Sequence, residues 1–216
     1  MADKKSTEKQ KHSELLKLAE DRGAYKAKII SSSMIVVEDR AQMRCLIPRC
    51  TSYNRTLTCP PNLPNPDQVR KLISEYQSAI MVQVRGTEAE DGKTEEMRRD
   101  YNWVYPCVYL LHELIHDLET HAFDLGYYFA MGLGGGDCRW CEMHSSDKVA
   151  SQELHASAGG CAGIKNGVCK QQYKARPAME GMSINVLKTA ENAGMPFHFS
   201  GKDEKYVIWN GVVLLD

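Results

Sequence analysis

Apolar and polar residues recur along the chain at two different spacings, which predict helices in some stretches and strands in others. Helical spacing is found over 13–22, 67–77 and 105–125. Stretches rich in apolar and β-branched residues predict strands over 26–39, 78–86 and 126–136. Helices and strands that alternate in this way predict an α/β fold, a single domain with a mixed sheet flanked by helices.

Two further elements are expected toward the end of the chain. Arg176-Pro177 predicts the start of a helix that ends near Gly194, because proline is favoured in the first helical turn. The N-terminus of that helix would point toward nearby cysteines and favour their negative charge. Asn210-Gly211 predicts the turn of a final β-hairpin.

Size and composition agree with one folded domain spanning 1–216, of which 1–12 are expected to form a flexible leader. Hydrophobic residues make up 43% of the chain, enough to bury a substantial core. A net charge of -1 gives no basic field that would attract nucleic acid. The sequence shows neither the run of about 20 apolar residues that a membrane span needs nor the core of an export signal. We therefore expect a cytoplasmic protein.

Eight cysteines carry the most informative chemistry of the chain. The reducing cytosol disfavours disulfides, so metal ligation is their expected role. Three lie in a proline-rich segment that cannot be a regular helix or a central strand, and they are called the front group: Cys45, Cys50 and Cys59. Four lie in a glycine-rich region and are called the C-terminal group: Cys138, Cys141, Cys161 and Cys169. These two groups are the predicted metal and cofactor ligands.

The spacing of these cysteines favours an iron-sulfur cluster over zinc. Structural zinc usually takes two short-spaced cysteine pairs, and only Cys138 and Cys141 form such a pair. Wider spacing suits the [4Fe-4S] cubane, whose four irons each take a thiolate. We expect one or two [4Fe-4S] clusters, more readily two, with a zinc protein as an alternative. Residues near the C-terminal group would offset the cluster's charge or shield it from water: Arg139, Trp140, Lys170, Lys174 and Arg176.

Residues 112–116 read H-E-x-x-H, the pattern by which two histidines one helical turn apart bind catalytic zinc. Both histidines are predicted on the polar side of their helix. The elongated form of this motif would need glycine in place of Glu119 and histidine in place of Ala122. Because both are absent, zinc protease chemistry is disfavoured.

Cys107, at the start of the same helix, leaves two alternatives open. As a fourth ligand it would complete the front group, and a fully ligated cluster would carry electrons. As a core thiol it would leave one iron open, able to act as a Lewis acid in a dehydration or desulfuration. Candidate acid or base groups for such an enzyme are His112, His116, Glu119 and Tyr53, and none is assigned a catalytic role.

Several motifs together resemble a known family. They are C-x4-C-x8-C-P-P from Cys45, L-E-x-x-A-F from Leu118, G-G-x-C-x2-C ending at Cys141, and R-P-x-M-E from Arg176, followed by G-x-x-I-x-V. This pattern resembles a family of bacterial and archaeal predicted metal-binding proteins of unknown function. The resemblance implies cysteine-bound iron-sulfur clusters in small cytosolic proteins of anaerobes. Relatives have a third cysteine where this chain has His144, so Cys161, after an insertion over 145–160, is the displaced third ligand.

The function expected from these observations is that of a redox or electron-transfer accessory to an anaerobic enzyme. The alternatives are an enzyme with an open iron on a three-cysteine cluster, and a zinc protein without turnover. The expected partner is a redox protein or a small-molecule substrate, not nucleic acid.

Overall fold

The computed structural model describes residues 2–87, 105–143, 161, 163–197 and 206–216. Its elements follow the chain in the order α1 (Ala2–Asp21), β1 (Lys26–Ser31), η1 (Ser32–Met34), η2 (Asp39–Gln42), α2 (Met43–Leu46), α3 (Pro66–Ser74), β2 (Ser78–Thr87), α5 (Tyr105–Asp124), β3 (Met131–Leu133), α6 (Trp140–Met143), α8 (Gly163–Asn166), α9 (Val186–Asn192) and β4 (Tyr206–Leu215).

The four described strands form one sheet in the order β1-β2-β4-β3. The central strands β2 and β4 pair along their whole length, with Ser78 opposite Leu215 and Thr87 opposite Tyr206. The predicted α/β class is confirmed, but every strand pair in the sheet is antiparallel, not mixed. A parallel bridge joins Gly134 to Ala178 outside the named strands.

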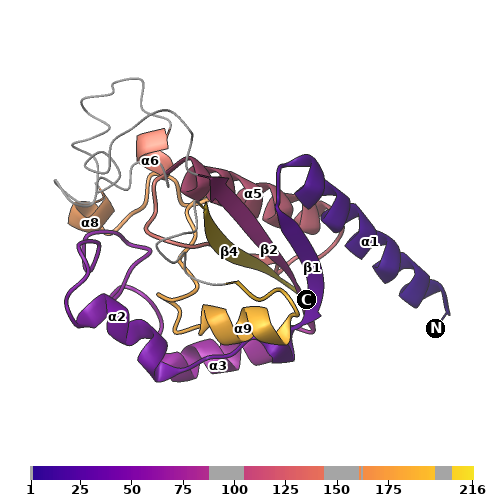
Figure 1. Cartoon of the computed structure of the whole chain (residues 1–216), viewed down its shortest axis with the longest axis horizontal. Coiled ribbons are helices and arrows are strands. Elements are labelled where there is room, and N and C mark those ends of the chain that lie inside the picture. The colour runs from indigo at the N-terminus through magenta and orange to yellow at the C-terminus, as the bar shows by residue number, and fades with distance from the viewer. Residues whose placement is uncertain (1, 88–104, 144–160, 162, 198–205) are drawn as a thin grey trace.

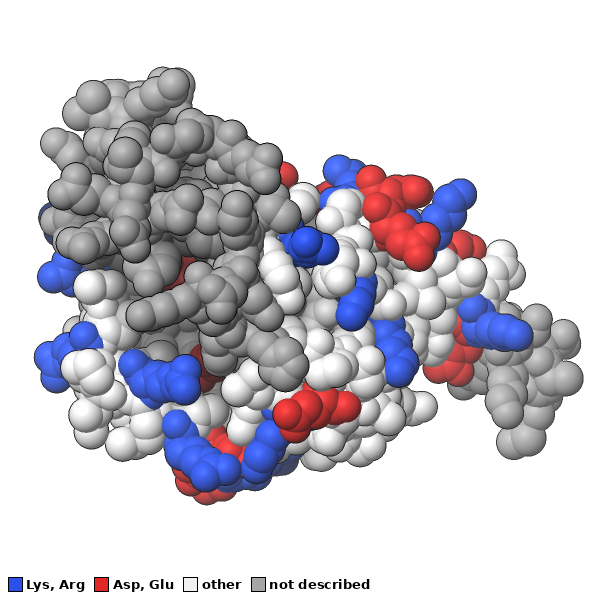
Figure 2. All heavy atoms as spheres, in the orientation of Figure 1, with Lys and Arg blue, Asp and Glu red and all other residues white. Residues whose placement is uncertain are grey.

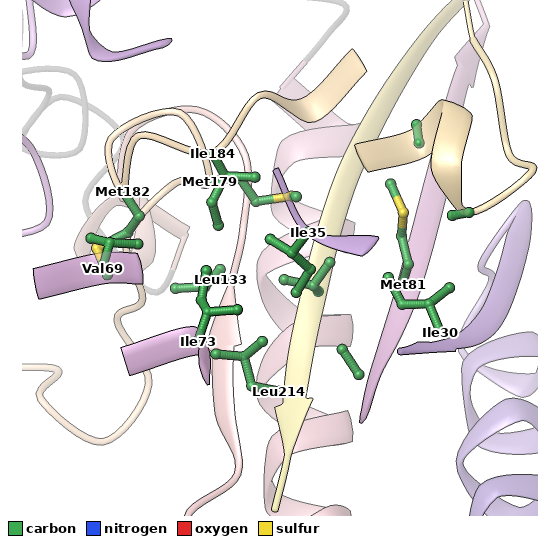
Figure 3. Close-up of a cluster of buried hydrophobic side chains, with 14 of the residues drawn as sticks. Ile30, Ile35, Val69, Ile73, Met81, Leu133, Met179, Met182, Ile184 and Leu214 are labelled. Atoms are coloured by element: carbon green, nitrogen blue, oxygen red, sulfur yellow. The ribbon is translucent and has the colours of Figure 1, made fainter. Parts of the chain in front are cut away.

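The sheet buries both faces because alternate residues of a strand point to opposite sides. On one face Ile80, Val82 and Val84 pack with the apolar sides of α1 and α5. On the other face Met81 and Leu214 pack with α3, α9 and the segment before α9 (Figure 3). Figure 1 shows the resulting three layers, with the sheet between α1 and α5 on one side and α3 and α9 on the other.

The predicted C-terminal hairpin is wrong, because β4 is one continuous strand. Asn210 and Gly211 lie inside it, opposite Gln83 and Val82. The Asn210 side chain accepts a hydrogen bond from the buried Gln83 amide at 3.0 Å. A Cβ on Gly211 would lie 2.8 Å from Ile115 Cδ1 and 3.0 Å from the Leu133 carbonyl oxygen. Glycine is required here for close packing against α5 and β3, not for a turn.

The helix predicted to start at Arg176-Pro177 is also wrong. Its helical part, α9, begins only after Asn185, whose side chain caps it by accepting from the Lys188 backbone N–H at 3.1 Å. Residues 178–184 form turns that bury Met179, Met182 and Ile184 in the core. The predicted helix N-terminus at the cysteines is therefore absent.

Other boundaries also differ from the prediction. Helix α1 begins at Ala2 instead of about residue 13, and β3 is shorter than the strand predicted over 126–136. Residues 88–104, and the insertion over 145–160, lie outside the described residues. In the part of the chain that the structure describes, no helix is both long and apolar enough to cross a membrane. Figure 2 shows basic and acidic side chains next to each other over the described part of one face, in keeping with a net charge of -1.

Candidate metal centre

A glycine turn after β3 brings Cys138 to its position. A Cβ on Gly135 would lie 3.0 Å from Trp209 Cε3 and 3.1 Å from the Asn210 carbonyl oxygen, and Gly136 has φ +74°, so both positions favour glycine. Gly134 ties the turn to the segment after Arg176: its N–H donates to Pro177 at 2.9 Å and its carbonyl accepts from Met179 at 2.8 Å. Cys138 therefore stands between the core and the R-P-x-M-E segment.

The thiols of the C-terminal group converge. The pKa of Cys138 is raised to about 12, chiefly by burial. The charges of Cys169, Cys141 and Cys161 act in the same direction. Burial also raises the pKa of Cys141, together with the charges of Cys161 and Cys169, while Lys170 lowers it. Such mutual effects require the four sulfurs to lie in one region. Cys161, the displaced ligand of the sequence prediction, is among them.

Backbone amides point at three of these sulfurs. The N–H of Trp140 bonds to Cys138. Gly163 N and Gln171 N lie 3.3 Å from the sulfurs of Cys161 and Cys169. In each case the donor lies two residues after the cysteine. Amide donors favour the charged thiolate, the form that binds metal, and tune the potential of a bound cluster.

The front group lies in a chain of tight turns after α2. Cys50 N donates to Cys45 O at 3.1 Å, and Asn62 N donates to Cys59 O at 3.1 Å. Burial raises the pKa of Cys59 to about 11, as do the charges of Asp137, Cys45 and Cys50, while a hydrogen bond with the Thr56 side chain lowers it. The pKa of Cys45 is raised by burial, by Cys50 and by Glu180. The three thiols thus lie within electrostatic reach of each other.

The two cysteine groups adjoin. Cys161 N donates to the Arg55 carbonyl oxygen at 2.6 Å, which joins the front loop directly to the C-terminal group. A Cβ on Gly163 would lie 2.8 Å from Leu57 Cδ1, so the same two segments pack closely. Figure 1 shows the loop after α2 reaching α8 at one end of the molecule. Two metal sites built on these groups would be neighbours.

Cys107 lies apart from both groups. It is 6% exposed and belongs to the core formed by the sheet with α1 and α5. A Cβ on Gly86 would lie 2.1 Å from its sulfur, so the thiol fills the space that the β2 glycine leaves. Its pKa is raised by burial alone. The structure supports the core-thiol alternative for Cys107.

The H-E-x-x-H histidines lie beside the turn that carries Cys138, and among the described residues they belong to no group that could hold a metal ion. His112 is 3% exposed, contrary to its predicted position on the polar side of the helix, and its Nε2 lies 3.1 Å from the Asp137 carbonyl oxygen. His116 meets the ring of Trp140 edge-on, with centroids 5.6 Å apart. Burial lowers the pKa of both histidines. They support the turn that carries Cys138.

The other acid or base candidates are separated. Glu119 accepts two hydrogen bonds from the Arg176 guanidinium, one of them at 2.6 Å, and a third from Gly132 N at 2.9 Å. It therefore joins α5, β3 and the R-P-x-M-E segment. Tyr53 lies in the front loop, where its N–H donates to Cys50 and Arg49 stands over its ring. Of the four candidates, only Tyr53 belongs to the front loop.

The residues predicted to offset charge have specific partners. Arg139 is 6% exposed and donates to Asp137 Oδ1 at 3.3 Å. Lys174 Nζ stands 5.3 Å above the Trp140 ring, and Trp140 itself is 2% exposed. Arg176 is held by Glu119, as described. Lys170 acts on Cys141 through its charge. Four cationic side chains and a buried tryptophan thus lie near the C-terminal group.

Sequence reasoning missed two carboxylates beside the front group, Asp137 and Glu180. Their charges act on Cys59 and Cys45 respectively. Both are visible in the motifs, because Asp137 directly precedes Cys138 and Glu180 ends R-P-x-M-E.

The described residues contain no group of three or more His, Cys, Asp or Glu side chains whose geometry could hold a metal ion. The family comparison nevertheless points to metal. A family model described as predicted metal-binding protein (DUF2284) matches residues 28–215. The chain belongs to this family. The match spans both cysteine groups of this DUF2284 member and agrees with the family resemblance seen in the sequence. No curated protein matches the chain, and no solved structure does.

Proposed function

We propose that this DUF2284 protein binds two [4Fe-4S] clusters, one at each cysteine group, and passes single electrons to a partner enzyme in the cytoplasm of an anaerobe. The observation that carries the proposal is the C-terminal group, in which four thiols converge and three accept backbone N–H bonds. Four thiolates complete the ligand set of a cubane, and such a cluster supplies one-electron redox chemistry when bound.

The donor set of each group fits this cofactor. Thiols are soft ligands that select zinc, copper or iron-sulfur clusters over hard cations. Zinc would need its ligands gathered about one ion at about 2.3 Å. Only Cys138 and Cys141 form a short-spaced pair along the chain, and the wider spacing of the other cysteines favours the larger cluster. Lys170 and the buried Arg139 would offset the negative charge of a four-thiolate cluster.

The contact between the groups supports electron transfer. One-electron steps need centres that lie close together, and Cys161 is bonded directly to the front loop at Arg55. The two centres would then act as a short relay that ends at the surface near the half-exposed front thiols.

The experiment is reduction of protein purified without oxygen, followed by electron paramagnetic resonance. Reduction with dithionite is expected to give the signals of reduced cubanes, and reoxidation is expected to remove them. A protein that contains zinc but shows no reducible signal would end the redox proposal and favour the zinc alternative.

A second candidate is favoured by the position of Cys107. Because this thiol is packed against Gly86 in the core, the front group has three cysteines near one another and no fourth. A cluster held by three thiolates leaves one iron that can polarise a substrate oxygen or sulfur, as in a dehydration or desulfuration. Substrate would then be expected to perturb the signal of one cluster and leave the other unchanged.

A further inference from the structure

Charge is distributed unevenly along this chain. The stretch over 43–66 holds three arginines and no Asp or Glu, and the stretch over 161–179 holds three lysines, one arginine and no Asp or Glu. Because the net charge of the whole chain is -1, the remaining residues hold the excess of carboxylates. The segments that carry the front group and half of the C-terminal group are therefore basic.

Five of these basic side chains are exposed, and they are Arg44, Arg49, Arg55, Lys165 and Lys170. Figure 2 shows Lys and Arg side chains at the left end of the molecule, where Figure 1 places α8 and the loop after α2. The exposed carboxylates that border the first stretch along the chain, Asp39 and Asp67, are both bound by Arg70. The described part of this end thus presents a basic surface.

The carboxylates between the two segments do not reverse this charge. Asp137 and Glu180 lie close to the cysteines, but neither is an exposed residue. The Asp137 carboxylate also accepts a hydrogen bond from the buried Arg139 at 3.3 Å. A molecule that approaches this end therefore meets arginine and lysine before it meets either carboxylate.

Exposed apolar side chains stand among these charges, and they are Met43, Leu46, Ile47, Val168 and Tyr173. Ile47 is 68% exposed and Tyr173 is 79% exposed. Basic side chains alone could serve to offset the charge of a bound cluster, but exposed apolar side chains do nothing for that charge. Apolar side chains with a polar rim are typical of a surface that binds another protein.

The two segments present these side chains on one surface because they pack on each other. Cys161 is bonded to Arg55, as described, and Gln42 Nε2 donates to the Gly181 carbonyl oxygen at 2.8 Å. A Cβ on Gly181 would lie 2.9 Å from Leu63 Cδ1. The exposed side chains over 43–55 and 165–173 are called the basic surface. The exposed Cys50 belongs to it, so a protein bound there would lie against the front group.

We propose that the basic surface docks an acidic protein that carries single electrons, with its carboxylates facing the exposed arginines and lysines. This inference rests on the proposed function, because it takes the front cluster as the centre that gives up the electron. The cluster would be oxidised by one electron and the carrier's cofactor reduced by one, with no bond formed or broken. Opposite charge would speed the encounter and orient the carrier, and Ile47, Val168 and Tyr173 would pack against it.

The test measures binding of the full chain, purified without oxygen, to two small acidic carriers, a plant-type ferredoxin and a flavodoxin. Fluorescence anisotropy of the labelled carrier gives the Kd at low and at high ionic strength. Both carriers are expected to bind, and the Kd is expected to rise at least about tenfold at high ionic strength, because salt screens exposed charges. A basic c-type cytochrome and a double-stranded DNA oligonucleotide are expected to bind more weakly than either carrier.

Two variants change the basic surface without touching a proposed ligand. Lys165→Glu reverses an exposed charge on α8 and is expected to raise the Kd about three- to tenfold. Tyr173→Ala removes an exposed ring and is expected to raise it at least about threefold. Their iron content should equal that of the wild type, so that loss of a cluster is not mistaken for loss of binding.

Matched controls lie elsewhere on the molecule. Lys17→Glu reverses an exposed charge on α1, which Figure 1 shows at the opposite end from α8. Phe129→Ala removes a ring that is 75% exposed, and the Phe129 backbone N–H bonds to Asp216 at the end of the chain. Both controls are expected to keep the wild-type Kd.

Other results overturn one of the two proposals. The basic surface would be excluded as the docking site if neither carrier bound, if salt left the Kd unchanged, or if the controls weakened binding as much as the variants. Tighter binding of the cytochrome or the DNA would exclude an acidic protein as the partner. Reducible clusters in protein that binds neither carrier would leave the proposed function intact, whereas carrier binding by protein without iron and sulfide would overturn that function and the electron step.

Discussion

The two cysteine groups use the same donor atom in different surroundings. In the C-terminal group, three of four sulfurs receive a backbone N–H from two residues further along, and Lys170 adds positive charge. In the front group, Thr56 bonds to Cys59, while Asp137 and Glu180 add negative charge beside the thiols. Amides and cations favour thiolate, and carboxylates oppose it.

This difference gives the two centres different properties. The C-terminal group has four half-buried thiols, three of which accept a backbone N–H. The front group has three thiols, and Cys50 is exposed. We expect its cluster to be the one that is lost first in air and the one that meets a partner.

Removal of one ligand from each group is expected to have the largest effect. Cys50→Ser and Cys141→Ser are each expected to lose about four irons per chain, because each removes one of the thiolates proposed to hold one cubane. The measurement is iron and sulfide content, with Cys107→Ala as the control that keeps all its iron. Loss of all iron in either variant would show one shared site instead of two.

The ion pair between Glu119 and Arg176 holds the R-P-x-M-E segment, which lies near the C-terminal group, against α5. Its side chains are 15% and 20% exposed, so Glu119→Gln leaves a partly buried cation unpaired and is expected to cost about 2 to 4 kcal/mol in the free energy of unfolding. Urea denaturation measures this. Asp117→Asn on the same helix breaks a pair with Arg22 that is 57% exposed on the arginine side, and is expected to cost under about 1 kcal/mol. Equal costs would contradict the anchoring role.

The packing of Cys107 is tested by crowding it. Gly86→Ala would bring a Cβ to 2.1 Å from the sulfur and is expected to destabilise the protein by about 1 to 3 kcal/mol. Cys107→Ala removes that sulfur, so the double variant is expected to recover much of the loss. A thermal or urea denaturation series measures both. If the changes in the free energy of unfolding were simply additive, Gly86 and Cys107 would not be in contact.

The pH dependence of the stability of metal-free protein tests the burial of Cys59. The raised pKa of Cys59, about 11 against an ordinary 9.0, means that the folded state holds this proton more tightly than the unfolded chain. Stability is therefore expected to be full below about pH 9 and to fall between about pH 9 and pH 11. Cys59→Ala should reduce the fall in a urea midpoint series. Metal-loaded protein should not show it, since bound thiols have already lost their protons.

The sequence predicted much of the fold because its signals were local. The helix over 105–125 and the strand over 78–86 were confirmed as α5 and β2, where periodicity agreed with tertiary packing. The prediction of a hairpin failed at Asn210-Gly211. There a strong turn signal was overridden by ten residues of pairing between β4 and β2 and by close packing on Ile115. It failed again before α9, where three apolar residues entered the core instead of a helix.

The site was predicted less completely for a similar reason. The short spacing of Cys138 and Cys141 shows their proximity directly, whereas the approach of Cys161 to them, and of Arg55 to Cys161, depends on the fold. The position of Asp137 beside Cys59 joins residues far apart in the chain and has no local pattern. The ligand role of the seven cysteines stays a prediction of the sequence.

The most direct test of two neighbouring clusters is the content of iron, zinc and acid-labile sulfide in protein purified without oxygen. Two cubanes predict about eight irons and about eight sulfides per chain, with little zinc. Zinc without sulfide would contradict the account entirely, and about four irons would show that one of the two cysteine groups holds no cluster.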